Sequence, residues 1–162
     1  MASVELHKNY CDNVLSWNEI FLNFDLAAKS KELIKHNPIG FFVCHSAWRI
    51  DRLKPIMKDY NIPEKNIFAD ELIFDKDGYI TSINKKNPLS KNLGKIEIAK
   101  KIKGEKIIIG DGYTDYEIKK YKFASKFIQH IENINRKNLN SKADLISNSL
   151  DESISYIIKE YE

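Results

Sequence analysis

The stretch that decides the fold is KIIIGDGYTDYEI, which runs from Lys106 to Ile118. It begins as an apolar run of strand length and stops at Asp111, which lies between two glycines and is followed by a second acid, Asp115. Glycine lets the backbone turn sharply beside Asp111. Thr114 is a good N-cap residue, so we expect a helix to start there. The stretch therefore predicts a buried strand, a tight turn and a helix, with two carboxylates at the junction.

From residue 39 onward, the chain alternates between the patterns of strands and helices. The expected strands cover residues 39–45, 106–110, 125–131 and 143–148, and the expected helices cover 48–60, 93–103, 114–122 and 150–161. Residues 66–84 are expected to form a strand and then a hairpin, whose turn runs from Asp75 to Gly78. Residues 132–142 are expected to form a surface loop. Strands that are buried on both faces and separated by helices form parallel sheets. We therefore expect an α/β fold, a three-layer, Rossmann-like parallel sheet with helices on both faces and a small β-hairpin.

The size and composition of the chain exclude several classes of protein. Its 162 residues are enough for one domain, and 43% apolar and 30% charged residues are typical of a soluble globular protein. The net charge is only +3, and no basic stretch with interleaved aromatic residues predicts nucleic-acid binding. No apolar run reaches the roughly 18–20 residues that span a bilayer, and the N-terminus lacks the features of a signal peptide. We expect a reduced, cytoplasmic protein without nucleic-acid or membrane partners.

Polar residues follow two of the expected strands. In an open parallel sheet, ligands bind beyond the carboxyl ends of the strands, which is where Ser46 and Asp111 are expected to lie. Asp111 and Asp115 are expected to cluster at the start of a helix. Two neighbouring carboxylates repel each other, and a bound hard cation such as Mg²⁺ is the simplest way to neutralise that repulsion. Lys95 lies at the start of the preceding helix, where a positive charge interacts unfavourably with the helix dipole. We therefore expect that it is placed there either for packing or to bind an anionic ligand. Each residue alone is more often structural, but their order and spacing predict a site.

From Gly40 to the C-terminus, the chain resembles the phosphoserine phosphatases of the haloacid dehalogenase superfamily. The segments that carry the resemblance are FFVCHS for the second motif, LGKIEIAKKI for the third, GDGYTDYE for the fourth, IFADELIFDKDGYIT between the second and third, and KFIQHIENINR and ADLI downstream. Members of this family usually carry Asn at the position of Asp70.

The resemblance implies a Mg²⁺-dependent phosphomonoester hydrolase that acts on a small phosphorylated metabolite such as phosphoserine, through an aspartyl-phosphate intermediate. Ser46 would donate a hydrogen bond to the transferring phosphoryl group, with Ala47 beside it in the substrate site. Lys95 would neutralise the charge of that group and hold the nucleophile. Asp111 would bind Mg²⁺, and Asp115 would support that ligation.

The first motif of the family, a strand that ends in D-x-D-x-[TV], has no direct counterpart in the chain. The nearest match is IFLNFDLAA, from Ile20 to Ala28. Asn23 then stands where the family has its nucleophilic Asp, Asp25 takes the place of the catalytic acid and base, and Ala27 replaces the Thr. An amide is a far poorer nucleophile than a carboxylate and brings no negative charge to Mg²⁺.

An alternative interpretation makes this segment helical, because the apolar residues between Val14 and Ile34 recur at helical spacing. The helical cap of the family is missing in either case, because only 20 residues separate Asp25 from Ser46. The helical interpretation also removes the central strand of the sheet. Exposed sheet edges favour association, so a homo-oligomer through such an edge or through the N-terminal helix is a further expectation.

The expected domain organisation is a single domain over residues 1–162, with a divergent helical segment at 1–38 and a phosphatase-like core at 39–162. Three functions stay open for it. The chain is an active phosphatase or the descendant of one, a catalytically inactive phosphate- or Mg²⁺-binding or protein-interaction module of the same fold, or one part of a split phosphatase whose first motif comes from another polypeptide.

Overall fold

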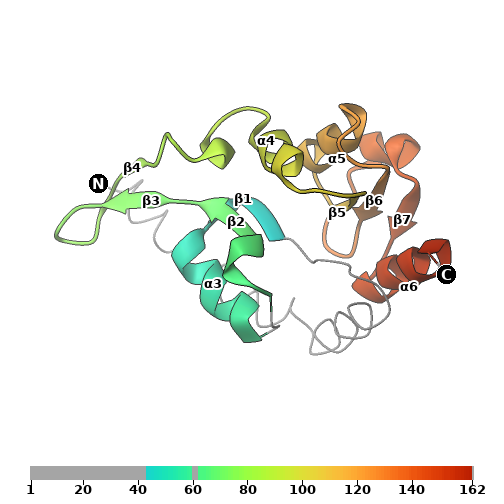
Figure 1. Ribbon diagram of the computed structural model, residues 1–162, viewed down its shortest axis with the longest axis horizontal. Coiled ribbons are helices and arrows are strands. Elements are labelled where there is room, and N and C mark those ends of the chain that lie inside the picture. The colour runs from blue at the N-terminus through green and yellow to red at the C-terminus, as the bar shows by residue number, and fades with distance from the viewer. Residues whose placement is uncertain (1–42, 60–61, 162) are drawn as a thin grey trace. The chain divides into compact units, whose positions relative to one another are not determined.

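The computed structural model describes residues 43–59 and 62–161 (Figure 1). The chain forms two compact units, Met1–Ser90 and Lys91–Glu162. The expected single domain over residues 1–162 stays a prediction. None of the helices in the described part of the chain is long and apolar enough to cross a membrane.

The first unit is built on a strand–helix–strand element. Strand β1 (Val43–Arg49) leads into helix α3 (Ile50–Asp59), and a 3₁₀ turn, η1 (Glu64–Asn66), precedes strand β2 (Ile67–Asp70). The two strands pair in parallel, which is the arrangement that a helical crossover permits. Leu53 and Met57 lie one helical turn apart on α3 and pack against Ile67 and Ala69 of β2. This cluster is the core of the described part of the unit.

A β-hairpin follows β2, as the sequence predicts. Strands β3 (Leu72–Phe74) and β4 (Ile80–Ile83) are antiparallel. Asp75 Oδ1 accepts hydrogen bonds from the backbone N–H groups of Asp77 at 3.0 Å and Tyr79 at 2.9 Å, and Gly78 takes a φ of 83° that favours glycine. The hairpin is followed by a short 3₁₀ helix, η2 (Pro88–Ser90).

The second unit contains a three-stranded parallel sheet in the order β5-β6-β7. Its elements are helix α4 (Gly94–Lys101), strand β5 (Ile107–Gly110), helix α5 (Tyr113–Lys120), strand β6 (Lys126–His130), the 3₁₀ helix η3 (Lys137–Lys142), strand β7 (Leu145–Ser147) and helix α6 (Leu150–Tyr161). This sheet and the parallel strands of the first unit confirm the predicted α/β class.

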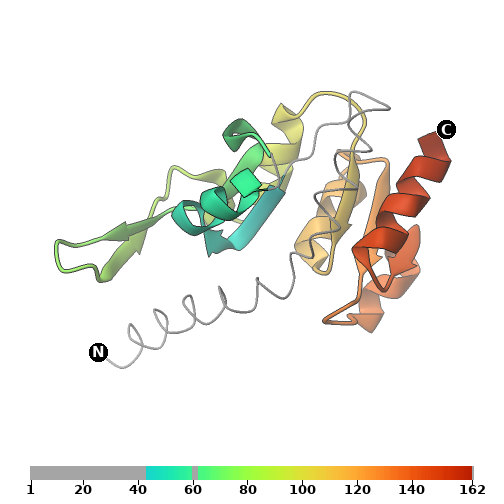
Figure 2. The ribbon, with the colours of Figure 1, turned by 90° about the horizontal axis from the view of Figure 1, so that it is seen from below.

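Helices cover both faces of this sheet (Figures 1 and 2). Consecutive residues of a strand point to opposite faces. On β6, Lys126 extends to α6, where its Nζ lies 2.9 Å from Glu160 Oε2 and 3.3 Å from Tyr156 Oη. The next residue, Phe127, is fully buried and packs against Tyr116 of α5, with ring centroids 5.8 Å apart and the rings tilted by 59°. The helices α5 and α6 therefore lie on opposite faces, as predicted.

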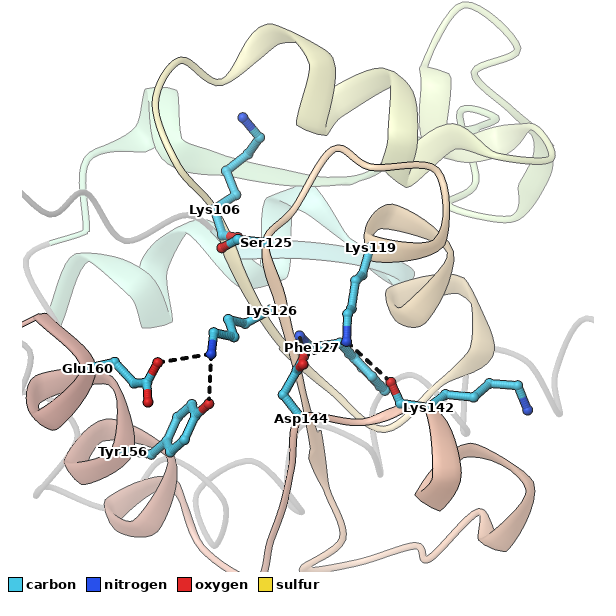
Figure 3. A network of polar contacts seen from close by, with 9 residues as sticks. All are labelled: Lys106, Lys119, Ser125, Lys126, Phe127, Lys142, Asp144, Tyr156 and Glu160. Carbon is cyan, nitrogen blue, oxygen red and sulfur yellow. Dashed lines mark hydrogen bonds and ion pairs between the residues drawn. The ribbon is translucent and has the colours of Figure 1, made fainter.

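Asp144 ties the loop before β7 to both α5 and β6 (Figure 3). Its Oδ2 accepts a hydrogen bond from Lys119 Nζ at 2.7 Å and another from the backbone N–H of Phe127 at 2.7 Å. Burial raises the pKa of Asp144, but these two hydrogen bonds and the nearby lysine charges outweigh it and hold the pKa below its ordinary value. The carboxylate therefore stabilises this junction in its charged form.

Two local predictions for the second unit were wrong. Residues 132–142 are not simply a surface loop, because they contain η3, whose Leu139 is fully buried. A single apolar residue in a polar stretch gave no periodic signal for this packing. The helix after β5 begins at Tyr113, with Gly112 as its N-cap, so Thr114 lies inside its first turn.

Candidate functional site

The best-formed cluster of charged groups lies at the carboxyl end of β5. Lys95, on the first turn of α4, places its Nζ 2.6 Å from Asp115 Oδ1 on α5. The two side chains are only 13% and 12% exposed. A buried pair of this kind is sensitive to the loss of either partner, because the remaining charge would be left without compensation. The sequence predicted both residues for the site, and the structure brings them together.

Gly110 makes the position of Asp115 feasible. A Cβ atom at Gly110 would lie 2.4 Å from Asp115 Cγ and 2.5 Å from its Oδ2, so only glycine lets the carboxylate fold back over the end of β5. The backbone N–H of Gly112 donates a hydrogen bond to that same Oδ2 at 3.1 Å. Both oxygens of Asp115 are therefore engaged within the protein.

Asp111 is in a different environment from Asp115. Its side chain is half exposed, and its Oδ2 lies 3.4 Å from Nη2 of Arg136, which is similarly exposed. Sequence reasoning included Arg136 only as the last residue of the segment KFIQHIENINR and gave it no role, because it lies 25 residues from Asp111 along the chain. The loop that carries Arg136 is fixed by Gln129 at the end of β6, whose Nε2 donates to the Arg136 carbonyl oxygen at 3.0 Å.

The acids at this strand end fit a magnesium ion in part. Mg²⁺ is commonly held by one or two carboxylates together with water and substrate oxygens. Asp111 is exposed enough to act as such a ligand. Asp115 fits the supporting role, because Lys95 and Gly112 already occupy its two oxygens. In residues 43–59 and 62–161, no group of three His, Cys, Asp or Glu side chains forms a ready-made metal cage.

Ser46 and Ala47 lie within β1, in the first unit, so the prediction that Ser46 follows the end of its strand was wrong. Regular pairing with β2 ends at His45, which is opposite Ala69, and resumes only at Arg49, so Ser46 and Ala47 fall in the irregular stretch between them. Lys95, Asp111 and Asp115 belong to the second unit. The predicted convergence of all these residues on one anion stays a prediction.

The degenerate first motif lies outside the described residues. This applies to Asn23 and Asp25, and also to the choice between a strand and a helix for residues 14–34. Their assignment to the nucleophile and acid–base positions is therefore unchanged from the sequence.

Asp70, the last residue of β2, is a buried acid that sequence reasoning did not assign to the site. Its side chain is 9% exposed, and its Oδ1 is buried without a hydrogen-bond partner. Burial raises the pKa of this carboxyl above its ordinary value. A possible signal in the sequence was its position, which usually carries Asn in the family that the chain resembles.

Several known proteins are similar to this chain in sequence and in fold. A chloroplastic phosphoserine phosphatase of Arabidopsis thaliana is 30% identical over 106 residues, which make up 60% of this chain and 36% of that protein. The structure of a phosphoserine phosphohydrolase-like protein from Francisella tularensis matches with a TM-score of 0.68 and 30% identity, over 83% of this chain and 62% of that one. The chain thus spans about a third of the first relative and under two thirds of the second.

Two further structures share the fold at lower identity. A substrate-bound phosphoserine phosphatase has a TM-score of 0.54 at 24% identity, over 70% of this chain and 55% of that one. DsGPDH of Dunaliella salina has a TM-score of 0.61 at 21% identity, over 88% of this chain and 24% of that one. No family profile matches the chain. The motifs, the fold and these relatives together confirm that the chain resembles the phosphoserine phosphatases of the haloacid dehalogenase superfamily.

Proposed function

We propose that the chain is a Mg²⁺-dependent phosphomonoester hydrolase that acts on a small phosphorylated metabolite of the phosphoserine type. The observation that carries the proposal is the buried Lys95–Asp115 pair at the carboxyl end of β5, with the exposed carboxylate of Asp111 directly after that strand. A cation held next to a carboxylate that can bind a metal is the combination that a phosphoryl group requires.

Each residue has a separable task in this proposal. Lys95 offers its ammonium group to the phosphoryl oxygens, and Asp115 holds that ammonium in position. Asp111 would hold Mg²⁺, which when bound supplies positive charge to neutralise the phosphate. Ser46 would donate a hydrogen bond to the same group, as the resemblance implies. Asp25 would act as the acid and base if residues 20–28 form the first motif.

A second candidate function is a phosphate- or Mg²⁺-binding module without catalysis. The observation that favours it is Asn23, because an amide at the nucleophile position cannot form an aspartyl-phosphate. A split phosphatase, which receives the missing carboxylate from another polypeptide, is the third possibility, and it shares the same binding residues.

A phosphatase assay separates these functions. The purified chain is incubated with Mg²⁺ and either p-nitrophenyl phosphate or phosphoserine, beside the variant Asp111→Ala. The matched control is Asp77→Ala, which removes an exposed acid from the hairpin turn. Turnover that is lost in Asp111→Ala and kept in Asp77→Ala supports the hydrolase.

The variant Asn23→Asp covers the case in which the wild type is inert. Gain of turnover in Asn23→Asp identifies residues 20–28 as a decayed first motif. If that variant is also inert, calorimetric titration with phosphate and Mg²⁺ distinguishes the binding module from a scaffold. Absence of turnover and of binding in every variant contradicts the proposed function.

A further inference from the structure

Asp70 is a buried acid whose Oδ1 has no hydrogen-bond partner among the described residues. It ends β2, and its side chain is 9% exposed. Removing an ionised carboxylate from solvent is unfavourable unless hydrogen bonds compensate for it. Burial accordingly raises the pKa of this group above its ordinary value. A neutral carboxyl differs from a carboxylate in one important respect, because it can donate a hydrogen bond.

The surroundings of Asp70 are those of a ligand-binding position. Ligands of parallel sheets bind at the carboxyl ends of the strands, and Asp70 is at that end of β2. The neighbouring strand departs from regular pairing at this level, since Ser46 lies between the His45–Ala69 pair and the Arg49–Asp70 pair.

The backbone beside Asp70 is held in place from the other side by Asn87. Asn87 Nδ2 donates to the Ala69 carbonyl oxygen at 2.7 Å, and Asn87 Oδ1 accepts from the backbone N–H of Leu89 at 3.0 Å. The turn that precedes η2 is thereby fastened to the end of β2. The position of Asp70 is therefore fixed by the fold rather than left to a mobile loop.

We propose that Asp70 is an anion-binding residue that works in its protonated form, donating its O–H to an oxygen of a phosphate-like dianion held at the Ser46 stretch of β1. The inference rests on the proposed function, which places the phosphate group at Ser46. Only a hydrogen bond forms, and the proton stays on Asp70. The expected consequence is that anion binding takes up a proton and weakens as the pH rises.

Other ionisable groups lie on the elements that pack against β2. They are Cys44, His45 and Arg49 on β1, and Asp51, Arg52, Lys54, Lys58 and Asp59 on α3, whereas η2 carries none. The adjacent Glu71 is engaged by Asn84, whose Nδ2 donates to Glu71 Oε2 at 2.6 Å. Arginine and lysine keep their charge near neutral pH, whereas histidine and cysteine are the residue types on these elements whose ordinary pKa values lie closest to it.

The test is a sulfate titration of the full ¹⁵N-labelled chain, followed through the amide signals of residues 69–71. Sulfate serves as the probe because it stays dianionic over the range from about pH 5 to about pH 8. In the wild type, the Kd should rise by up to about tenfold per pH unit above the free-state pKa of Asp70, because each bound sulfate requires one proton. The ¹³Cγ signal of Asp70 should titrate at a higher pH when sulfate is bound.

The variant Asp70→Asn should bind sulfate with a Kd that is independent of pH, and more tightly than the wild type at pH 7, because the amide always donates. The control Asp77→Asn makes the same change of charge on the exposed hairpin turn and should behave like the wild type. The amide spectrum and thermal unfolding of Asp70→Asn verify that the variant is folded.

Three kinds of outcome overturn the inference. If Asp70→Asn retains the pH dependence of the wild type, or if neither protein shows one, Asp70 is not the donor, while the phosphate site itself survives. If the amides of residues 69–71 do not respond to sulfate in any variant at any pH, the phosphate site at Ser46 fails together with the inference. A wild-type Kd that falls as the pH rises also contradicts it.

Discussion

The substitution Gly110→Ala tests whether the site depends on the close approach of Asp115 to β5. The new Cβ would lie 2.4 Å from Asp115 Cγ, 2.5 Å from Oδ2 and 2.6 Å from Cβ. Because the Cβ of Asp115 is among these atoms, rotation of the Asp115 side chain cannot relieve the clash. The backbone of β5 or of α5 has to move.

The expected cost follows from two contributions. Overpacking at a well-packed position costs about 1–3 kcal/mol, and the loss of a hydrogen bond to a charged group costs about 1.5–3 kcal/mol. A shift of the backbone relieves part of the overpacking. The same shift lengthens the contacts of Asp115 with Lys95 and Gly112, and so weakens its hydrogen bonds. We therefore expect Gly110→Ala to lower the free energy of unfolding by about 2–4 kcal/mol.

Urea unfolding followed by circular dichroism measures this change, and the amide signal of Gly112 reports on its hydrogen bond to Asp115. The control Gly104→Ala also introduces a Cβ, but nothing lies within 4 Å of it. Its cost should be only about 1–2 kcal/mol, from the positive φ of 87° at that position. The Gly112 amide should shift in Gly110→Ala and stay unchanged in Gly104→Ala.

A double-mutant cycle with Asp115→Gly gives the decisive comparison. Asp115→Gly removes all three atoms that the new Cβ would meet, so Gly110→Ala should cost much less in that background than in the wild type. Equal costs in both backgrounds would refute the steric argument. So would a Gly110→Ala variant that stays within about 0.5 kcal/mol of the wild type, the range usual for substitutions that disturb no packing.

Three further substitutions test the second unit. Lys122 takes a φ of 64° just beyond α5, so Lys122→Gly should raise the free energy of unfolding by about 0.5–1 kcal/mol in a urea titration, and destabilisation would contradict that assignment. Leu139→Ala should lower it by about 2–5 kcal/mol because Leu139 is fully buried, whereas Ile134→Ala, at a 49% exposed position, should change it by no more than about 0.5 kcal/mol. Asp144 has a pKa held below its ordinary value, so its stabilising effect is present above the unfolded-state pKa of about 3.9 and is lost as the pH falls through the folded-state pKa. Asp144→Asn should therefore be less stable than the wild type at pH 7 and should lose less stability on acidification below about pH 5, and a parallel loss in both proteins would exclude this role.

Local sequence signals predicted the elements of both units well. Apolar periodicity located the helices, and the turn residues between Asp75 and Gly78 located the hairpin, because these signals depend on neighbours a few residues apart. The same signals failed at Leu139. One apolar side chain in a polar stretch has no period, and its burial depends on the sheet and helix that it meets in the folded chain.

The sequence named the charged residues at the end of β5 but not the contacts that they make. A magnesium ion shared by Asp111 and Asp115 stays a prediction. In the structure each carboxylate has a different cationic partner, Arg136 for Asp111 and Lys95 for Asp115. These partners lie 25 and 20 residues away along the chain, so no local pattern assigns them.

The sequence by itself determined the alternation of strands and helices, the family resemblance and the identity of the charged residues that follow β5, because each of these is written in short, contiguous motifs. Only the tertiary structure decided which charges are compensated. It paired Lys95 with Asp115 in a largely buried position, left Asp111 exposed and, within the described part of the chain, left Asp70 Oδ1 buried without a hydrogen-bond partner. The physical reason is that desolvation and pairing depend on which distant segments come into contact, and these two effects set the charge state of an acid.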